Sequence, residues 1–135
     1  MLIIGKRLLL LLTFVSIFNV QSEEKQVLEN YAYYGLEPDI VTNYISSSKK
    51  LGFVRVNVEL MVNDPQALIE LEHHDPLLRA AVLEILGGQP EDKIKSMVGK
   101  ESIRQACFEA INRLLEDEVG ERLVVNLLFT QYLYN

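Results

Sequence analysis

The 135-residue chain has few of the residues from which metal, redox and disulfide sites are built. It contains one cysteine and two histidines. A single cysteine cannot form an internal disulfide, so Cys107 must have another role. It lies in "SIRQACFEAINRLL", on one helical stripe with Ile103, Ala110 and Ile111. This spacing predicts that the thiol is buried in a hydrophobic core.

The two histidines are adjacent, in the stretch "EHHDP". A metal site on a helix needs ligands that converge, such as histidines at positions i and i+4. His73 and His74 are expected to point apart in a corner between two helices. The sequence therefore predicts no metal site and no cofactor here.

Positive charge is scarce beyond the N-terminus. All nineteen acidic residues but only eleven of the thirteen basic ones follow residue 22, which gives that part of the chain a net charge of −8. An acidic domain without a basic stripe is poorly suited to nucleic acid or to anionic lipid surfaces. These are excluded as its main partners.

Long hydrophobic runs are also missing. A membrane-spanning helix needs roughly 20 apolar residues, whereas the run from Leu8 to Phe18 has 11. Basic residues precede it, and Val20 and Ser22 stand where a signal peptidase requires small side chains. Residues 1–22 are interpreted as a signal peptide cleaved between Ser22 and Glu23, or alternatively as a retained membrane anchor. Residues 23–30 would then be a tether to a domain over 31–135.

Four segments of that domain have the composition of β-strands. Tyr31–Gly35 and Ile40–Ile45 are aromatic and β-branched, and "LEPD" between them has turn chemistry. Strict alternation over Phe53–Val62 predicts a strand with Val54, Val56, Val58, Leu60 and Val62 on the buried face. Over Leu123–Tyr134 the same rule assigns Leu123, Val125, Leu127, Phe129 and Leu133 to one face and the alternate residues to the other.

Three helices are predicted between the third and fourth strands. Asp64–Pro65 and Asp75–Pro76 are N-cap and first-turn pairs, and Gly87–Gly88 is expected to end the second helix with a left-handed residue. A short turn at Pro90–Met97 leads to the third helix, Lys100–Glu116. The predicted fold is α+β, in the order β-β-β-α-α-α-β, with about four strands and helices on one side of the sheet. Acids in the last turn, "LLEDEVGE", oppose the helix dipole and are candidates for a basic partner.

The residue pattern contains no catalytic arrangement. The serines in "SSSKK" have ordinary turn composition, and the acids at positions 116, 117, 118 and 121 read as a solvated helix end. No nucleophile is placed beside a base. The chain is therefore interpreted as a non-enzyme without a small-molecule substrate. Two surfaces are candidates for partner or oligomer contacts: Phe53, Arg55, Asn57 and Glu59 on the mixed side of one strand, and Tyr132 with Tyr134 on the closing strand.

The ordered set of segments resembles the FliL family of flagellar basal-body-associated proteins. The resemblance is carried by "YYGLEPDIVTNY", "FVRVNVELMV", "HHDPLLRAAVLEIL", "GKESIRQACFEAINRLLEDEVG" and "VVNLLFTQYLYN" and extends from Tyr33 to Asn135. It implies a periplasmic domain similar to stomatin and prohibitin domains, on the periplasmic face of the bacterial inner membrane. It also implies oligomers around the motor stator that support flagellar rotation, swarming and chemotaxis, and it carries no catalytic residues over to this chain.

One departure from the family bears on the location of the chain. The family has a full-length transmembrane helix, whereas this N-terminus is short and ends in a cleavage signal. The resemblance thus leaves room for a secreted relative that joins a mixed ring with an anchored homologue. Fold alone does not fix function, so a generic periplasmic binding or chaperone-like module, unconnected with motility, is the alternative reading.

Overall fold

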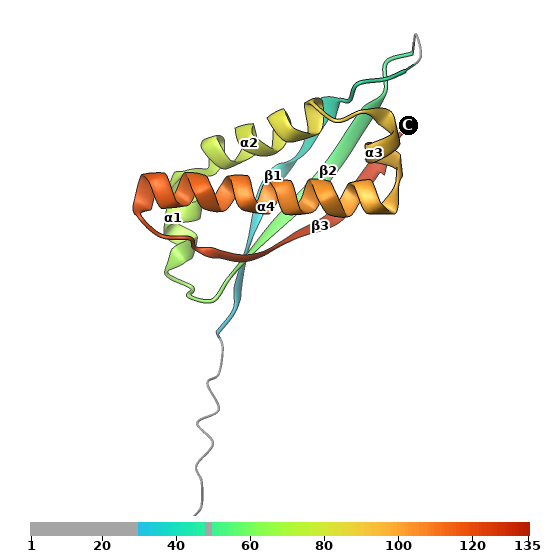
Figure 1. Ribbon diagram of the computed structural model, residues 1–135. Coiled ribbons are helices and arrows are strands. Elements are labelled where there is room, and N and C mark those ends of the chain that lie inside the picture. Colours follow the sequence, from blue (N-terminus) through green and yellow to red (C-terminus); the bar gives the residue numbers. More distant parts are fainter. Residues whose placement is uncertain (1–29, 48–49) are drawn as a thin grey trace, which may run out of the picture.

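A computed structural model describes residues 30–47 and 50–135, which form one antiparallel sheet covered by helices (Figure 1). The elements follow the order β1 (Ala32–Asn43), β2 (Phe53–Val62), α1 (Ala67–His73), α2 (Asp75–Gly87), α3 (Glu91–Lys95), α4 (Met97–Val119) and β3 (Val124–Tyr134). The sheet order is β1-β2-β3, so β2 is central. Helix α2 packs against β1 and α4 against β3, on the same side of the sheet. The α+β class is confirmed, but three strands and four helices replace the predicted four and three.

The missing strand is explained by β1, which joins the two segments predicted as separate strands. Leu36 pairs with Val58 and Ile40 with Val56, so three residues, Glu37 to Asp39, bulge out opposite Asn57. The Glu37–Pro38 peptide is cis. Because Leu36 and Ile40 are both buried on the same face, pairing with β2 resumes in phase after the bulge. The predicted turn at "LEPD" is therefore an irregularity within one strand.

The prediction for β2 is confirmed. Its residues alternate along the strand, and the set predicted to be inward is fully buried. These side chains form the floor of the core, because β2 is paired on both edges and covered by helices. The helices supply the other half of the core, and Cys107 lies in it, completely buried as predicted.

The helix boundaries differ from the predicted capping pattern. Helix α1 begins at Ala67, since the Asp64 carboxylate accepts a hydrogen bond from Gln66 N (3.0 Å) in a turn that precedes the helix. Asp75 is the first residue of α2 rather than its cap, and its Oδ2 accepts a 2.6 Å hydrogen bond from the Tyr34 hydroxyl. Asp64 thus accepts a backbone N–H in the turn just before α1, whereas Asp75 serves a tertiary contact in place of the predicted cap.

The ends of the two long helices also differ from the prediction. Gly88, after α2, has a right-handed conformation with φ −92°, so the predicted left-handed ending there is wrong. The left-handed glycine follows α4 instead, at Gly120 with φ 79°. Helix α4 is longer than predicted, because the Ser96 hydroxyl caps it by accepting a hydrogen bond from Gly99 N (3.0 Å).

Candidate interaction surfaces

Strand β3 determines which candidate residues share a surface, and it does not alternate regularly. Its pairing with β2 shifts register twice, between Asn57 and Val58 and between Met61 and Val62 of the partner strand. Each shift reverses the side to which the following residues point. The residues paired with the buried positions of β2 are therefore Val124, Leu127, Phe129, Tyr132 and Tyr134. The predicted division of β3 into two faces is wrong at Val124, Val125, Tyr132, Leu133 and Tyr134.

Tyr132 and Tyr134 consequently lie on the helix side of the sheet, beside α3. The Tyr132 hydroxyl donates a 2.8 Å hydrogen bond to the Ile94 carbonyl, and burial raises the pKa of this hydroxyl to about 12. The ammonium of Lys100 lies 5.0 Å from the Tyr132 ring centroid, and that of Lys95 lies 5.8 Å from the Tyr134 ring. These aromatic side chains thus help to hold α3 and the start of α4 against the sheet.

The other candidate set, Phe53, Arg55, Asn57 and Glu59, lies on the side of the sheet that the helices leave open. Each of these residues alternates with a buried residue of β2. The register places Tyr33 and Val41 of β1 and Leu128 and Leu133 of β3 on the same open face. Tyr33, Val41, Phe53 and Leu133 are between 40% and 52% exposed. We call this surface the open face; the two candidate sets therefore lie on opposite sides of the sheet.

A polar cluster occupies the middle of the open face. The Asn57 side-chain amide donates to Asp39 Oδ1 at 2.9 Å, and the Thr130 hydroxyl donates to Asn57 Oδ1 at 3.0 Å. Next to this cluster is a shallow hollow of about 530 Å³, lined by Glu37, Pro38, Asp39, Val41, Arg55 and Asn57. The open face thus has a polar centre between two apolar ends.

The cross-strand neighbours of Arg55 could not be predicted from the sequence alone. Its direct cross-strand neighbours are Val41 on β1 and Leu133 on β3. In the part of the chain that the structure describes, the Arg55 guanidinium is in no ion pair. An exposed arginine between two aliphatic side chains is a common anchor in protein interfaces.

The remaining chemically suggestive residues form no reactive arrangement. The rings of His73 and His74 meet edge to face, with centroids 4.9 Å apart, so they do not point apart as expected. Among residues 30–47 and 50–135, no group of three or more His, Cys, Asp or Glu side chains is placed to hold a metal. Burial raises the pKa of the Cys107 thiol to about 12. At neutral pH that thiol stays protonated, so it is a poor nucleophile.

The segment from β1 to β3 also matches a family known from sequence. The family model described as "Flagellar basal body-associated protein FliL" matches residues 33–134. The chain belongs to the FliL family. The matched range contains every residue of the open face named above, so this surface is part of the FliL domain itself.

A curated relative supports the assignment. The chain is 27% identical over 99 residues to the "Flagellar protein FliL" of Aquifex aeolicus (strain VF5). The alignment covers 73% of this chain and 58% of the relative. Because the chain spans little more than half of that FliL protein, its location and partners are treated below as proposals.

The residues that the structure describes do not decide how this FliL chain is located. Within the described residues, no helix combines the length and the apolar character needed to cross a membrane. The predicted cleavage site, Ser22 and Glu23, lies outside the described residues, as do the predicted signal peptide or anchor and nearly all of the predicted tether. The choice between a cleaved and an anchored FliL domain therefore stays a prediction.

The sequence analysis missed one exposed apolar feature of the FliL domain. Met97 and Val98, at the start of α4, are 89% and 83% exposed. The available signal was "KSMVGK", in which two apolar residues stand between polar ones at a helix start. This pair was not predicted to form a surface, because Pro90–Met97 was expected to be a short turn and not the junction of two helices.

Proposed function

We propose that this FliL-family chain is a non-catalytic structural component of the flagellar basal body that associates with the stator of the motor. In this role it supports flagellar rotation and, through rotation, swarming and chemotaxis. Its domain would stand at the periplasmic face of the inner membrane, alone or in a mixed ring with an anchored homologue. The family membership supports the basal-body setting, and the open face supports a role in binding.

The single observation that carries this proposal is the open face. Three-stranded sheets with helices on one side usually leave a polar second face, but this one exposes Val41, Phe53 and Leu133 around Arg55, and Tyr33 at its other end. A mixture of apolar side chains and one arginine that forms no ion pair within the described residues resembles the central part of a protein interface. The matching occupant is a stator segment with apolar side chains and a carboxylate that can pair with Arg55.

Site-specific photo-crosslinking in motile cells tests the proposal. A photoreactive amino acid replaces Phe53 on the open face or, as the control, Leu83 on α2, and these positions are 40% and 38% exposed. A stator protein crosslinked to position 53 but not to position 83 is the expected result. Equal crosslinking from both positions, or capture of assorted envelope proteins at position 53, would instead favour a generic periplasmic binding module.

The proposed location has its own test. N-terminal sequencing of the protein recovered from the envelope fraction reports how residues 1–22 are processed. A chain that begins at Glu23 is a cleaved periplasmic form, and an intact Met1 is an anchored form. Recovery of the folded chain from the cytosol would contradict both forms.

A further inference from the structure

Strand β3 forms one margin of the sheet (Figure 1), and its backbone groups alternate between β2 and the outer edge. Val124 faces the outer edge, because Asn112 binds both its N–H and its C=O. Leu127 faces the same way, since its N–H donates to Asn126 Oδ1 at 2.9 Å and its C=O accepts from the guanidinium of Arg104 at 3.2 Å. Side chains thus satisfy the outer edge along the first half of β3.

The second half of this edge is different. Phe129 lies two residues beyond the last of these outward positions, in the same register, and therefore also faces outward. Further along, Asn135 N donates inward to Phe53 O at 3.3 Å. Tyr134 and Tyr132 alternate with it and face outward. The outward N–H and C=O groups of Phe129, Tyr132 and Tyr134, which we call the β3 edge, form no hydrogen bond within the described residues.

The β3 edge also differs from the other margin of the sheet in its protection against pairing. Natural edge strands are usually interrupted by charged residues, proline or bulges. On β1, Glu37 to Asp39 bulge out of the strand, and Arg79 binds the proline carbonyl of this bulge at 2.6 Å. Apart from its register shift, the stretch from Phe129 to Tyr134 has neither charge nor proline. Such an edge is suited to pairing with an extended segment of another protein.

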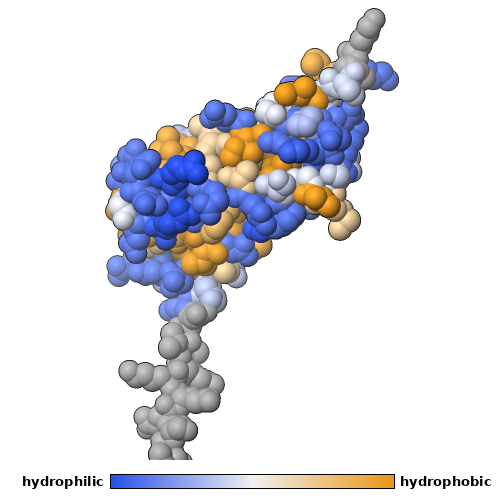
Figure 2. Space-filling view, viewed as in Figure 1, coloured by the Kyte–Doolittle hydropathy of each residue, from blue (hydrophilic) through white to orange (hydrophobic). Residues whose placement is uncertain are grey.

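The two sides of the β3 edge differ in chemistry. On the helix side, Lys100 lies 5.0 Å from the Tyr132 ring centroid and forms no ion pair with any described residue. Lys95, by contrast, is paired with Glu91 at 2.9 Å. Figure 2 shows an orange tip at the start of α4 and blue, hydrophilic surface beyond it along the helix. On the other side, the exposed side chain of Leu133 continues the open face.

We propose that an extended segment of the stator pairs with the β3 edge and adds a strand to the sheet. Main-chain hydrogen bonds provide the affinity and alternate side chains the specificity. The segment carries an acidic side chain opposite Lys100 and apolar side chains beside Leu133. The β3 strand of a second copy does not match, because Val124–Tyr134 contains no acid. The added strand widens the open face, so this proposal deepens the proposed function and rests on it for the identity of the partner.

Amide hydrogen exchange of the full-length protein measures pairing at the β3 edge directly. The isotope-labelled protein is studied by NMR, alone and with overlapping synthetic peptides that cover the periplasmic segments of the stator proteins. In the free protein, the amides of Tyr132 and Tyr134 should exchange fast and those of Gln131 and Leu133 slowly, because only the latter face β2. A binding peptide should slow exchange at Tyr132 and Tyr134 by at least about tenfold, the effect of one net hydrogen bond.

Two substitutions at one position separate the backbone from the side chain. Tyr134→Pro removes the outward N–H, whereas the control Tyr134→Ala removes the same ring and keeps the N–H. Circular dichroism checks that both variants are folded. The affinity for the peptide should be at least about tenfold lower for Tyr134→Pro than for Tyr134→Ala. Equal affinities would overturn the proposal.

Charge reversal on α4 tests the expected side-chain pattern. Lys100→Glu should weaken peptide binding by about fivefold, and more at low salt than at high salt. The control Arg113→Glu reverses an exposed positive charge farther along the same helix and should have little effect. Equal losses from the two variants would indicate long-range attraction alone and would contradict contact at the β3 edge.

The other outcomes separate this proposal from the proposed function. Peptide binding that leaves exchange at Tyr132 and Tyr134 unchanged would overturn the proposal, as would protection of these amides by self-association without peptide. If no peptide binds while position 53 still crosslinks to the stator, the β3 edge is not the stator site and the proposed function stands. If position 53 also captures no stator protein, both are wrong.

Discussion

At the scale of single residues, Asn112 joins the last helix to the last strand. It is the buried polar residue of the described core. Its amide nitrogen donates to the Val124 carbonyl at 2.9 Å, and its Oδ1 accepts from Val124 N at 3.0 Å. The side chain thus satisfies both backbone groups of the first β3 residue, as a neighbouring strand would do. Register at the start of β3 depends on this pair of hydrogen bonds.

Asn112→Ala should therefore lower the free energy of unfolding by about 2–4 kcal/mol, because it leaves a buried N–H and a buried C=O without partners. Urea denaturation followed by circular dichroism measures the loss. Gln105→Ala, at an exposed position of the same helix, should change stability by less than about 0.5 kcal/mol. Equal effects of the two substitutions would show that Asn112 has no special role.

Cys107 gives a second prediction at this scale. Burial raises its pKa from the ordinary 9.0 to about 12, so at pH 8 roughly one folded molecule in ten thousand carries the thiolate. A disulfide reagent such as DTNB should leave the native protein almost unmodified and react with one equivalent after urea is added. Rapid stoichiometric reaction in native buffer would mean that the thiol is accessible and that the core is open at α4.

At the scale of elements, the sequence patterns predicted the buried residues correctly where the residues of a single strand or helix are sufficient to determine them. Val54, Val56 and Val58 alternate because β2 is central and straight, and period two is then sufficient. The predictions from pattern were wrong where pairing with a neighbouring strand determines how far a strand continues and to which side its residues point. Leu36 and Ile40 belong to one strand because both pair with β2 across a bulge, and turn composition in "LEPD" cannot distinguish a bulge from a chain reversal.

The candidate surfaces show the same limit. Tyr132 and Tyr134 were assigned to the other side of the sheet from Phe129 by alternation, but the register shift beyond Phe129 brings all three to one side. Asp75 was expected to cap a helix and instead accepts a hydrogen bond from Tyr34, 41 residues away. Local rules describe what a side chain can do, and tertiary contacts decide which of these options is realised.

The junction of α3 and α4 gives a prediction at this scale. Gly99→Ala places a methyl group against the Lys93 backbone, which must move, and should lower the free energy of unfolding by about 1–3 kcal/mol. Gly88→Ala is the matched control, since its nearest atoms would be at 3.5 and 3.8 Å and its backbone is right-handed. This control should stay within about 0.5 kcal/mol of the wild type or stabilise the protein slightly.

If Gly99→Ala were as stable as Gly88→Ala in thermal and urea unfolding, the close approach of α4 to α3 would not be required. The junction of α3 and α4 would then be free to adjust without loss of stability.

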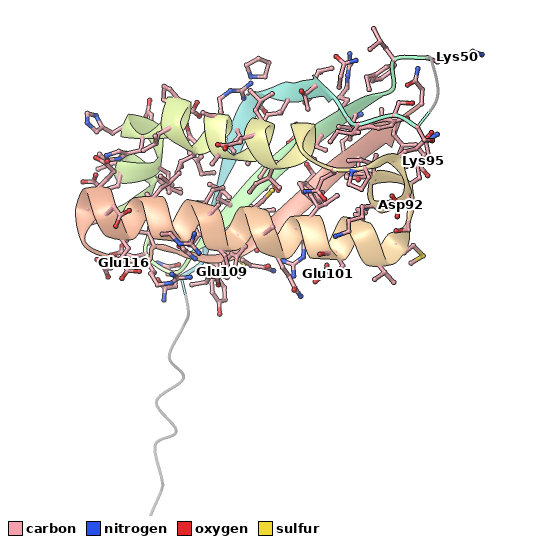
Figure 3. All side chains as sticks on the ribbon, turned by 45° about the horizontal axis from the view of Figure 1, so that its top comes forward. Lys50, Asp92, Lys95, Glu101, Glu109 and Glu116 are labelled. Carbon is pink, nitrogen blue, oxygen red and sulfur yellow. The ribbon has the colours of Figure 1, made fainter. Side chains whose placement is uncertain are left out.

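At the scale of the whole molecule, the sheet separates two surfaces with different chemistry. Helices cover one side, while the other side is left open. Composition predicted the acidic character and the family resemblance predicted the flagellar setting, but neither showed how charges lie along the helix side, with Asp92, Lys95 and Glu101 towards one end of α4 and Glu109 and Glu116 towards the other (Figure 3). That arrangement depends on the packing of α3 against α4, which no local pattern contains.

The central claim is that the open face acts in the flagellar motor. The most direct test measures bead rotation under high load in cells whose own gene is replaced by the wild type, by Arg55→Glu or by the control Glu118→Arg, an exposed position on α4. The account predicts that deletion lowers the rotation speed, that the wild type and Glu118→Arg restore it, and that Arg55→Glu does not. Normal rotation without the gene, or full restoration by Arg55→Glu at equal protein level, would contradict it.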